Sequence, residues 1–110
     1  MSTHAFVEMR TYTLVPGKTA AYFALYEREG LAVQREHLGE MFGYYATEIG
    51  HANTVVHMWR YDSWDDRIRR RTGLKDDPRW QAYLAQMLPL LVDQDVKILL
   101  PAPFFTLPAR

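Results

Sequence analysis

Residues 55–66 read VVHMWRYDSWDD, and this stretch holds both a strand and the start of a helix. Aromatic and β-branched side chains follow one another from Val55 to Tyr61, as is typical of a strand. Ser63 then stands three residues before Asp66, which is the spacing of an N-terminal helix cap. The stretch therefore predicts a short strand that leads almost directly into a helix.

Two strand patterns and one long helix pattern come before this stretch. A strand is expected at Phe6–Leu14, which is rich in Val, Thr and Tyr and ends before the turn signal Pro16-Gly17. Residues 19–38 repeat large side chains at steps of three and four, which predicts a helix. Residues 41–49 predict a second strand, which a hairpin loop at residues 50–53 joins to the third.

The pattern after the opening stretch predicts a broken helix and a last strand. Thr72-Gly73 is expected to interrupt the helix that Ser63 begins. Asp77-Pro78 should restart it, because aspartate caps helices and proline suits the first helical position. Pro89 should end or kink this run, and a final strand is expected at residues 95–100. The order βαββαβ predicts a ferredoxin-like α+β fold, with a four-stranded antiparallel sheet and both helices on one face.

Length and composition exclude several classes of protein. The 110 residues fit a single domain over 1–110, with peripheral tails at 1–5 and 106–110. Zero cysteine removes disulfides, thiolate metal sites and thiol nucleophiles. Thirteen basic and 13 acidic residues give a net charge of zero, so no broad field for nucleic acid is expected. Because neither a signal peptide pattern nor a membrane span is visible, the sequence predicts a cytoplasmic protein.

The face of the sheet that the helices leave bare is expected to carry the function. Strand side chains alternate, so each central strand offers one compact apolar set and one large polar or aromatic set. We assign to the helix side the compact set: Val7, Met9, Val56 and Met58. The large set would then bind a ligand on the bare face: Glu8, Arg10, Tyr12, His57, Trp59 and Tyr61. Such an aromatic patch is typical of an interaction surface, and two of these faces would close a homodimer around a partly polar cavity.

A set of short motifs spans nearly the whole chain. In order they are Met9-Arg10-x-Tyr12, Pro16-Gly17-Lys18, Leu38-Gly39, Glu48-Ile49-Gly50, Val55-Val56-His57-x-Trp59, Tyr61-Asp62-Ser63, Asp66-Arg67, Asp77-Pro78-x-Trp80 and Pro101-x-Pro103-Phe104. Together they resemble the NIPSNAP family. The resemblance implies a dimeric α/β barrel of ferredoxin-like protomers, and it brings no assigned enzymatic activity. His51 and Phe105 depart from the family's usual Pro and Ser, in positions that affect only loop and tail.

His57 is the strongest candidate for chemistry. Imidazole titrates near neutral pH, so beside Tyr12 and Tyr61 it could serve as a general acid or base. A structural histidine that orders the dimer is the simpler interpretation, because no nucleophile or metal partner stands at a diagnostic spacing. Glu8 and Arg10, two residues apart on one strand face, are expected to pair for structure more than for chemistry.

Metal, cofactor and nucleic-acid binding are not expected. Metal-ligand spacing is absent among the four histidines, which are His4, His37, His51 and His57. His37 suits the negative end of a helix dipole. The basic run of Arg67, Arg69, Arg70 and Arg71 is interpreted as a solvated helix face. RNA stacking on Trp59 and Tyr61 is the alternative, but the zero net charge and the absence of a glycine-flanked aromatic motif speak against it.

Three hypotheses of function follow. The first is a homodimeric protein of unassigned activity that holds a small hydrophobic or aromatic molecule in the barrel. The second is a cofactor-independent oxygenase or isomerase, in which His57 acts as the base and Arg10 holds the resulting oxyanion. The third is a protein–protein interaction module whose Phe104-Phe105 tail docks a partner.

Overall fold

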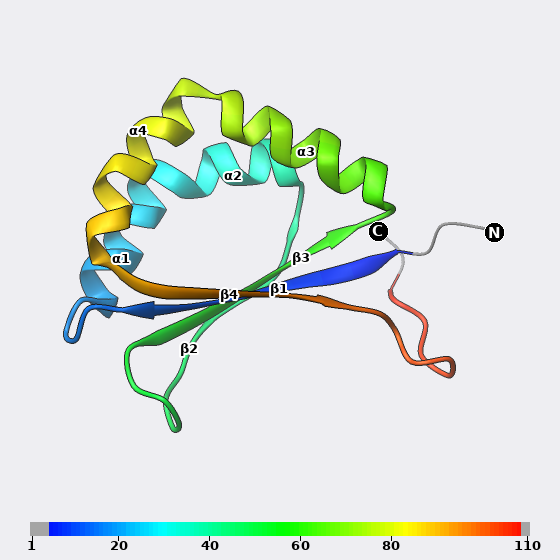
Figure 1. The fold of residues 1–110 in the computed structure, drawn as a ribbon, viewed down its shortest axis with the longest axis horizontal. Coiled ribbons are helices and arrows are strands. Elements are labelled where there is room, and N and C mark those ends of the chain that lie inside the picture. Colours follow the sequence, from blue (N-terminus) through cyan, green and yellow to red (C-terminus); the bar gives the residue numbers. More distant parts are fainter. Residues whose placement is uncertain (1–4, 109–110) are drawn as a thin grey trace.

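The computed structural model describes residues 5–108, which form a four-stranded antiparallel sheet with helices on one side (Figure 1). The elements in chain order are β1 (Phe6–Leu14), α1 (Thr19–Leu25), η1 (Tyr26–Gly30), α2 (Leu31–Leu38), β2 (Met41–Ala46), β3 (Thr54–Tyr61), α3 (Trp64–Asp76), α4 (Pro78–Met87), η2 (Leu88–Leu90) and β4 (Leu91–Leu99). The βαββαβ order and the ferredoxin-like α+β fold are confirmed. Of the tails expected at the two ends, residues 1–4 and 109–110 lie outside the described part of the chain.

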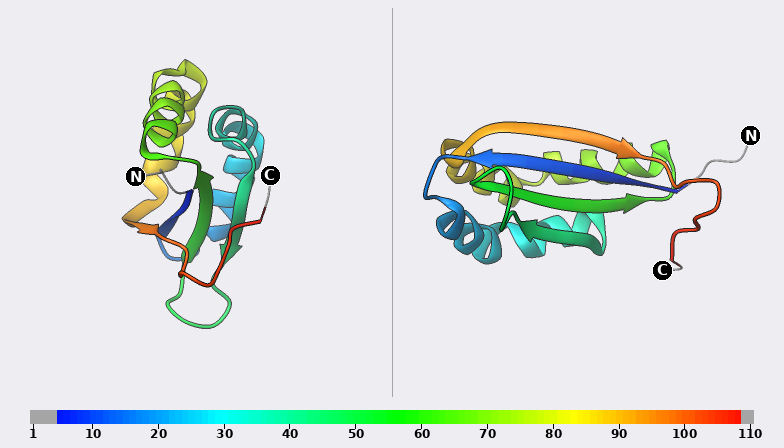
Figure 2. Two further views of the ribbon diagram at one scale, coloured as in Figure 1. Left: turned by 90° about the vertical axis from the view of Figure 1, so that its right-hand side faces the viewer. Right: turned by 90° about the horizontal axis from the view of Figure 1, so that it is seen from below.

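The sheet places β1 and β3 at its centre, because the strand order is β2-β3-β1-β4. Met9 lies opposite Met58 across this central pair, and Arg10 lies opposite His57. Two rows of helices cover the sheet side by side, α1 and α2 in one row and α3 and α4 in the other (Figure 2). None of the helices within residues 5–108 combines the length and the apolar character that crossing a membrane requires.

Both predicted caps are present at the starts of α3 and α4. The Ser63 hydroxyl accepts a hydrogen bond from the Asp66 backbone N–H at 3.0 Å, and Asp77 accepts one from the Arg79 backbone N–H at 2.9 Å. The predicted break at Thr72-Gly73 is wrong, because α3 continues to Asp76. This glycine serves packing instead of termination.

Gly73 and Gly30 both mark places where another side chain approaches the backbone closely. A Cβ on Gly73 would lie 3.0 Å from Nδ1 of His37, which belongs to α2. A Cβ on Gly30 would lie 2.9 Å from the ring of Tyr26 and 3.0 Å from the ring of Tyr83. Gly30 ends η1, a π-helical segment inside the long helix predicted at 19–38. The glycines therefore let the two helix rows pack tightly above the sheet.

The two faces of the sheet are the reverse of the expectation from the sequence. The large set points toward the helices: Glu8, Arg10, Tyr12, His57, Trp59 and Tyr61. Tyr12 packs with Tyr22 of α1 and Tyr83 of α4, whereas Trp59 packs with residues of α2 and α3. The compact set of Val7, Met9, Val56 and Met58 alternates with these residues and so lies on the other side, which we name the open face.

The large set faces the helices because the helices carry partners for its polar side chains. α3 carries the arginines that neutralise Glu8, and α1 and α4 carry aromatic rings that fill the wide space above the sheet. Compact aliphatic and methionine side chains are left for the open face. Trp59 and Tyr61 are both fully buried, so the alternative of RNA bases stacking on them, which the sequence already disfavoured, does not fit this structure.

Candidate functional site

Five tyrosines surround His57 in the layer between the sheet and the helices. They come from five different elements, β1, α1, η1, β2 and α4, and are Tyr12, Tyr22, Tyr26, Tyr44 and Tyr83. We name this group, together with His57, the tyrosine cage. The space left inside it is about 10 Å³, which is enough for one water molecule. The cage is therefore a closed, largely aromatic interior with several polar atoms.

His57 is fixed within the cage by rings and by one hydrogen bond. Its imidazole stacks on Tyr44 with ring centroids 4.6 Å apart, and it meets the Tyr12 ring edge-on at 4.9 Å. The indole N–H of Trp59 donates to Nδ1 of His57 at 2.7 Å. The other ring nitrogen, Nε2, is buried and has no hydrogen-bond partner within residues 5–108.

The protonation of His57 follows from these contacts. Burial, with the nearby charges of Arg10 and Arg71, lowers the pKa of His57 to about 3, so the ring is neutral at pH 7. A neutral imidazole carries one proton, and Nδ1 cannot hold it because Nδ1 accepts from Trp59. We therefore place the proton on Nε2. The cage presents a buried N–H donor that lacks an acceptor.

Four of the tyrosines around His57 also hold their protons. Burial raises the pKa of Tyr22 to about 12, and it raises the pKa values of Tyr26, Tyr44 and Tyr83 as well. Tyr22 and Tyr44 share a hydrogen bond between their hydroxyls, and the Tyr26 hydroxyl donates to Oε1 of Gln34 at 2.5 Å. These four tyrosines and His57 are therefore neutral at pH 7.

Glu8 forms a second polar centre beside the cage. Arg67 of α3 donates to it at 2.6 Å, Arg10 donates at 2.9 Å, and Arg71 approaches to 3.7 Å. Burial raises the pKa of the Glu8 carboxyl, but the hydrogen bonds from Arg67 and Arg10 outweigh it, so this pKa lies below its ordinary value. One buried carboxylate therefore meets three guanidinium groups, and Arg10 links them to the cage by donating to the Tyr12 hydroxyl at 3.1 Å.

The structure divides the arginine run that the sequence suggested was a solvated face. Arg69 and Arg70 pair with Asp66 on the helix itself, at 2.6 and 2.8 Å. Arg67 and Arg71 reach down to Glu8 instead. Half of the run therefore turns toward Glu8 and is half-buried.

Lowering the pH from 6.5 to 5 should destabilise the protein through His57. The unfolded chain binds a proton at this residue below about pH 6.5, whereas the folded chain resists protonation until about pH 3, so stability is lost as the pH falls. The expected loss is about 2 kcal/mol over this interval, from about 1.4 kcal/mol for each pH unit. Urea unfolding measures it. His57→Gln should flatten the dependence, whereas His51→Gln should leave it; an unchanged slope in His57→Gln would contradict the assignment.

The six residues proposed from the sequence lie together, but as parts of different centres. Tyr12 and His57 belong to the tyrosine cage, and Trp59 fixes His57 from outside it. Glu8 and Arg10 belong to the second polar centre, the one around the Glu8 carboxylate. Tyr61 lies in the apolar cluster with Phe6, at a ring distance of 5.9 Å.

Sequence reasoning missed the partners that the helices and β2 supply. The helical spacing of Tyr22, Tyr26 and Tyr83 fits ordinary core residues, and no local pattern marks Tyr44. Tyr44 lies opposite His57 in the β2–β3 pairing, in a register that runs regularly from Ala46 opposite Val55 to Gly43 opposite Met58. The sequence missed the pair because β2 ends at Ala46, whereas a strand that ran to residue 49 with a loop at 50–53 would shift the register and place another residue opposite His57.

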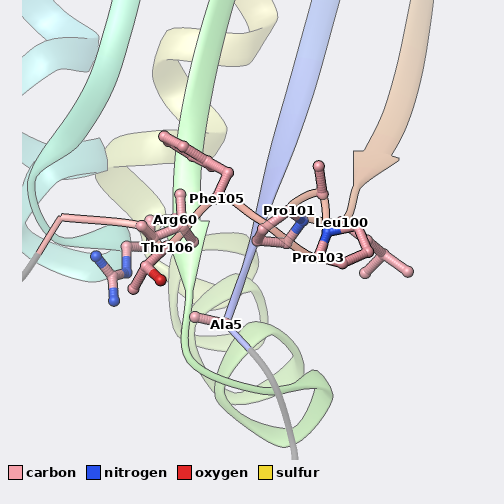
Figure 3. Close-up of a pocket in the computed structure, with 9 residues that line it drawn as sticks. Ala5, Arg60, Leu100, Pro101, Pro103, Phe105 and Thr106 are labelled. Atoms are coloured by element: carbon pink, nitrogen blue, oxygen red, sulfur yellow. The ribbon is translucent and has the colours of Figure 1, made fainter.

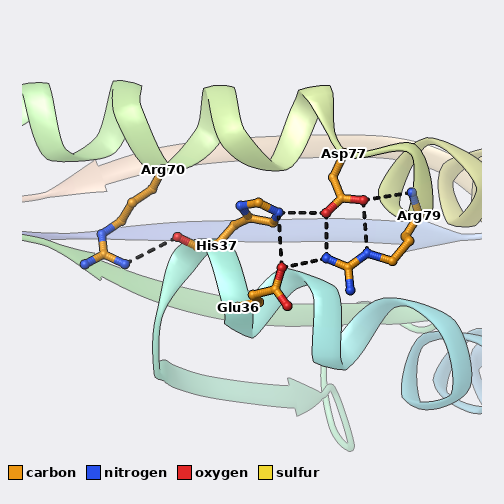
Figure 4. Close-up of polar contacts among 5 residues, drawn as sticks. All are labelled: Glu36, His37, Arg70, Asp77 and Arg79. Carbon is orange, nitrogen blue, oxygen red and sulfur yellow. Dashed lines mark hydrogen bonds and ion pairs between the residues drawn. The ribbon is translucent and has the colours of Figure 1, made fainter.

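A second polar cluster links the end of α2 to the start of α4 (Figure 4). His37 lies 2.9 Å from Asp77, and together with Glu36 they bring three possible metal-ligand atoms within 4.8 Å of one another. However, the guanidinium of Arg79 lies 2.6 Å from Glu36 and 2.7 Å from Asp77. The arginine takes the place that a metal ion would need, so we interpret the cluster as a structural clamp between helices.

The C-terminal tail lines a hollow at one end of the sheet (Figure 3). Its volume is about 490 Å³, and its walls include Leu100, Pro101, Phe105 and Arg60. The Arg60 guanidinium donates to the backbone oxygen of Pro108. An adjoining hollow of about 260 Å³ lies between the tail and the open face. The tail thus covers one edge of the open face and leaves most of that face bare.

These features define a class: a ferredoxin-like α+β domain with one sheet face that no helix covers and a closed polar-aromatic interior. The NIPSNAP family model matches residues 7–106, and the chain belongs to the NIPSNAP family. A NipSnap homolog of Dictyostelium discoideum is 34% identical over 94 residues, covering 86% of this chain and 41% of that protein. Mouse NipSnap homolog 3B is 33% identical over 105 residues, covering 94% and 42%. The chain thus spans about two fifths of the length of these relatives.

Solved structures of bacterial relatives agree closely with this fold. A NIPSNAP family protein of Agrobacterium tumefaciens is 41% identical with a TM-score of 0.89, covering 96% of this chain and 92% of that one. An uncharacterized NIPSNAP-like domain protein of Burkholderia xenovorans is 47% identical with a TM-score of 0.87, covering 96% and 91%. Another structure from Agrobacterium tumefaciens, described as having unknown function, is 43% identical with a TM-score of 0.89, covering 96% and 95%. The chain therefore shares its fold with bacterial NIPSNAP proteins, two of which are described as uncharacterized or of unknown function.

Proposed function

We propose that the protein binds a small aromatic molecule that carries a hydrogen-bond acceptor, inside each protomer and between the sheet and the helices. The observation that carries this proposal is the buried Nε2–H of His57, which lacks an acceptor. A buried donor without a partner costs about 1–3 kcal/mol, and a ligand carbonyl or carboxylate would recover it. The surrounding tyrosine rings offer stacking surfaces for an aromatic body.

The ligand requires the tyrosine cage to open, because about 10 Å³ is too small for a ring. The π-helical segment η1 supplies Tyr26 to the cage wall. Such segments are rare and occur often at functional sites. A shift of η1 toward regular helix would move Tyr26 and make room beside His57. In this closed state, one water molecule fits the space.

The alternative of a cofactor-independent enzyme with His57 as general base is less well supported. A base that works at pH 7 needs a pKa near that value, whereas burial lowers the pKa of His57 to about 3. Nδ1 accepts from Trp59, and Nε2 already carries the proton. Arg10, the proposed oxyanion holder, is paired with Glu8 at 2.9 Å. The geometry favours binding over proton abstraction.

We also propose that two copies pair through their open faces, as the sequence suggested, although through a different set of side chains. Val7, Met9, Val56 and Met58 give this face an apolar centre. β4 adds an exposed nine-residue edge strand, and Leu99 at its end is 40% exposed. An apolar face beside a long free edge favours association, and a twofold dimer is the commonest closed arrangement.

Binding of acetophenone and ethylbenzene tests the ligand proposal, since the two differ in one acceptor oxygen. Acetophenone should bind wild type at least about tenfold more tightly, because its carbonyl accepts from His57 Nε2–H. Isothermal titration calorimetry measures both affinities. In His57→Leu the preference should vanish, whereas in His51→Gln it should persist. Equal affinities of the two compounds for wild type, or no binding of either, would overturn the proposal without recourse to any variant.

A further inference from the structure

A groove runs between α3 and α4 on the outer side of the tyrosine cage. Its volume is about 570 Å³, within the range of sites that hold small molecules. We name it the outer groove. Its walls are formed by Arg67, Ile68, Arg71, Thr72, Leu74, Lys75, Trp80, Gln81 and Leu84.

The charge in the outer groove is of one sign. Arg67, Arg71 and Lys75 follow one another at steps of four residues and so lie along one face of α3. Carboxylates are absent from the lining residues. Within residues 5–108, the carboxylate paired with Arg67 and Arg71 is that of Glu8, which must also neutralise Arg10. Three guanidinium groups against one carboxylate leave an excess of two positive charges, to which Lys75 adds a third.

The remaining walls are apolar and aromatic. Ile68, Leu74 and Leu84 line the groove together with the indole of Trp80. Trp80 is the one residue that lines both the outer groove and the space inside the tyrosine cage, among the residues described. Its ring packs on that of Tyr83 with centroids 4.9 Å apart. The Trp80 side chain is thus the partition between the groove and His57.

We infer that the outer groove admits and holds aromatic carboxylates, with the carboxylate at Arg71 and Lys75 and the ring against Trp80. This inference rests on the proposed function and narrows its ligand to the anionic acceptors. A carboxylate would supply the negative charge that the cluster around Glu8 lacks, and charge-assisted hydrogen bonds to guanidinium are strong. The apolar walls select a compact aromatic acid over a phosphodiester chain, which would place its sugars against Ile68 and Leu84.

The same charge excess acts on the ligand's second contact. Arg10 and Arg71 help to keep the His57 ring neutral, so Nε2 stays a donor that suits a carboxylate oxygen. A ring that passes Trp80 would meet Tyr83 and then His57. The groove and the cage are therefore complementary to the same kind of ligand, one with a hydrogen-bond acceptor attached to an aromatic ring.

Benzoate and acetophenone are the probes for this inference, because they have nearly the same shape and differ in charge. Calorimetry on wild type should show benzoate binding at least about tenfold more tightly at low salt. Arg71→Gln/Lys75→Gln should remove that advantage, while acetophenone should still bind more tightly than ethylbenzene. Lys18→Gln/Arg28→Gln removes two positive charges elsewhere on the chain and should leave the preference intact. Raising the salt concentration should weaken benzoate alone.

The possible results separate this inference from the proposed function. Equal affinities of benzoate and acetophenone for wild type, or a preference that survives Arg71→Gln/Lys75→Gln, would overturn the outer groove as the anion site. In that case the proposed function still stands if acetophenone binds more tightly than ethylbenzene and His57→Leu removes the difference. Benzoate binding that depends on Arg71 and Lys75, with no binding of acetophenone, would support the groove and overturn the cage. No binding of either probe would overturn both.

Discussion

Replacing Glu8 by Gln should destabilise the protein by about 3–5 kcal/mol, because it leaves three guanidinium groups around a neutral amide. Arg67 lies 2.6 Å from this buried carboxylate and Arg10 lies 2.9 Å from it. A loss of this size is a large part of the stability of a small domain. Urea unfolding at pH 7 measures it.

Two companion measurements show whether the loss arises from charge. Glu8→Gln/Arg71→Gln should recover part of the stability, because one of the crowded cations is gone. Sulfate should stabilise Glu8→Gln more than it stabilises wild type, since an anion can replace the missing carboxylate. Asp95→Asn, at an exposed pair with Lys97, should change stability by less than about 1 kcal/mol. If Glu8→Gln were as stable as wild type, the Glu8 carboxylate would not be needed to neutralise the three guanidinium groups, which would contradict this account of the centre.

Met58→Asp should convert the proposed dimer to monomers. Met58 lies opposite Met9 at the centre of the open face, so a twofold pairing would bury one carboxylate from each copy without a partner. The expected cost is at least about 4 kcal/mol, or roughly a thousandfold in the dissociation constant. Sedimentation at micromolar concentration distinguishes about 26 kDa from the 12.9 kDa of one chain, twice 12.9 being 25.8.

The matched control for the dimer is Ile68→Asp. Ile68 is an exposed apolar residue of α3, on the helix side of the sheet, so an acid there should leave the dimer intact. A monomeric wild type, or a Met58→Asp protein that stays dimeric, would contradict pairing through the open face. Loss of the dimer in Ile68→Asp alone would move the interface to the helix layer.

The fold could be predicted from the sequence because its signals are local. Ser63 and Asp77 cap helices through hydrogen bonds to neighbours within three residues, and their side chains permit few other local structures. Helix α4 ends at Met87, two residues before Pro89, as the proline predicted. β4 begins at Leu91, four residues before the expected strand, because the turn η2 leads straight into the sheet edge.

The orientation of the sheet could not be predicted by polarity alone. Placing Glu8 and His57 on the bare face assumed that the helix side must be apolar. The sequence does not show locally that Arg67 and Arg71, about sixty residues away along the chain, supply the partners that make burial of Glu8 possible. Which face is buried depended on this long-range pairing.

Only the strand residues of the candidate site could be predicted from the sequence, because the rest of the site also depends on long-range packing. His57, Tyr12 and Trp59 stand out on two strands, because their alternation places them on one face. The remaining walls come from Tyr22, Tyr83 and other helix residues, whose spacing equally fits ordinary core. The tautomer of His57 depends on one hydrogen bond from Trp59, which no sequence pattern shows.

The most direct test of the account is nitrogen-15 NMR of His57 in the wild-type protein. At pH 7 the Nε2 resonance should be that of a protonated nitrogen in a neutral ring, and Nδ1 should be unprotonated. Saturating acetophenone should shift Nε2 strongly as its proton finds an acceptor, whereas ethylbenzene should not. A proton on Nδ1, a charged ring at pH 7, or an Nε2 resonance that acetophenone leaves unmoved would contradict a ligand site built around this donor.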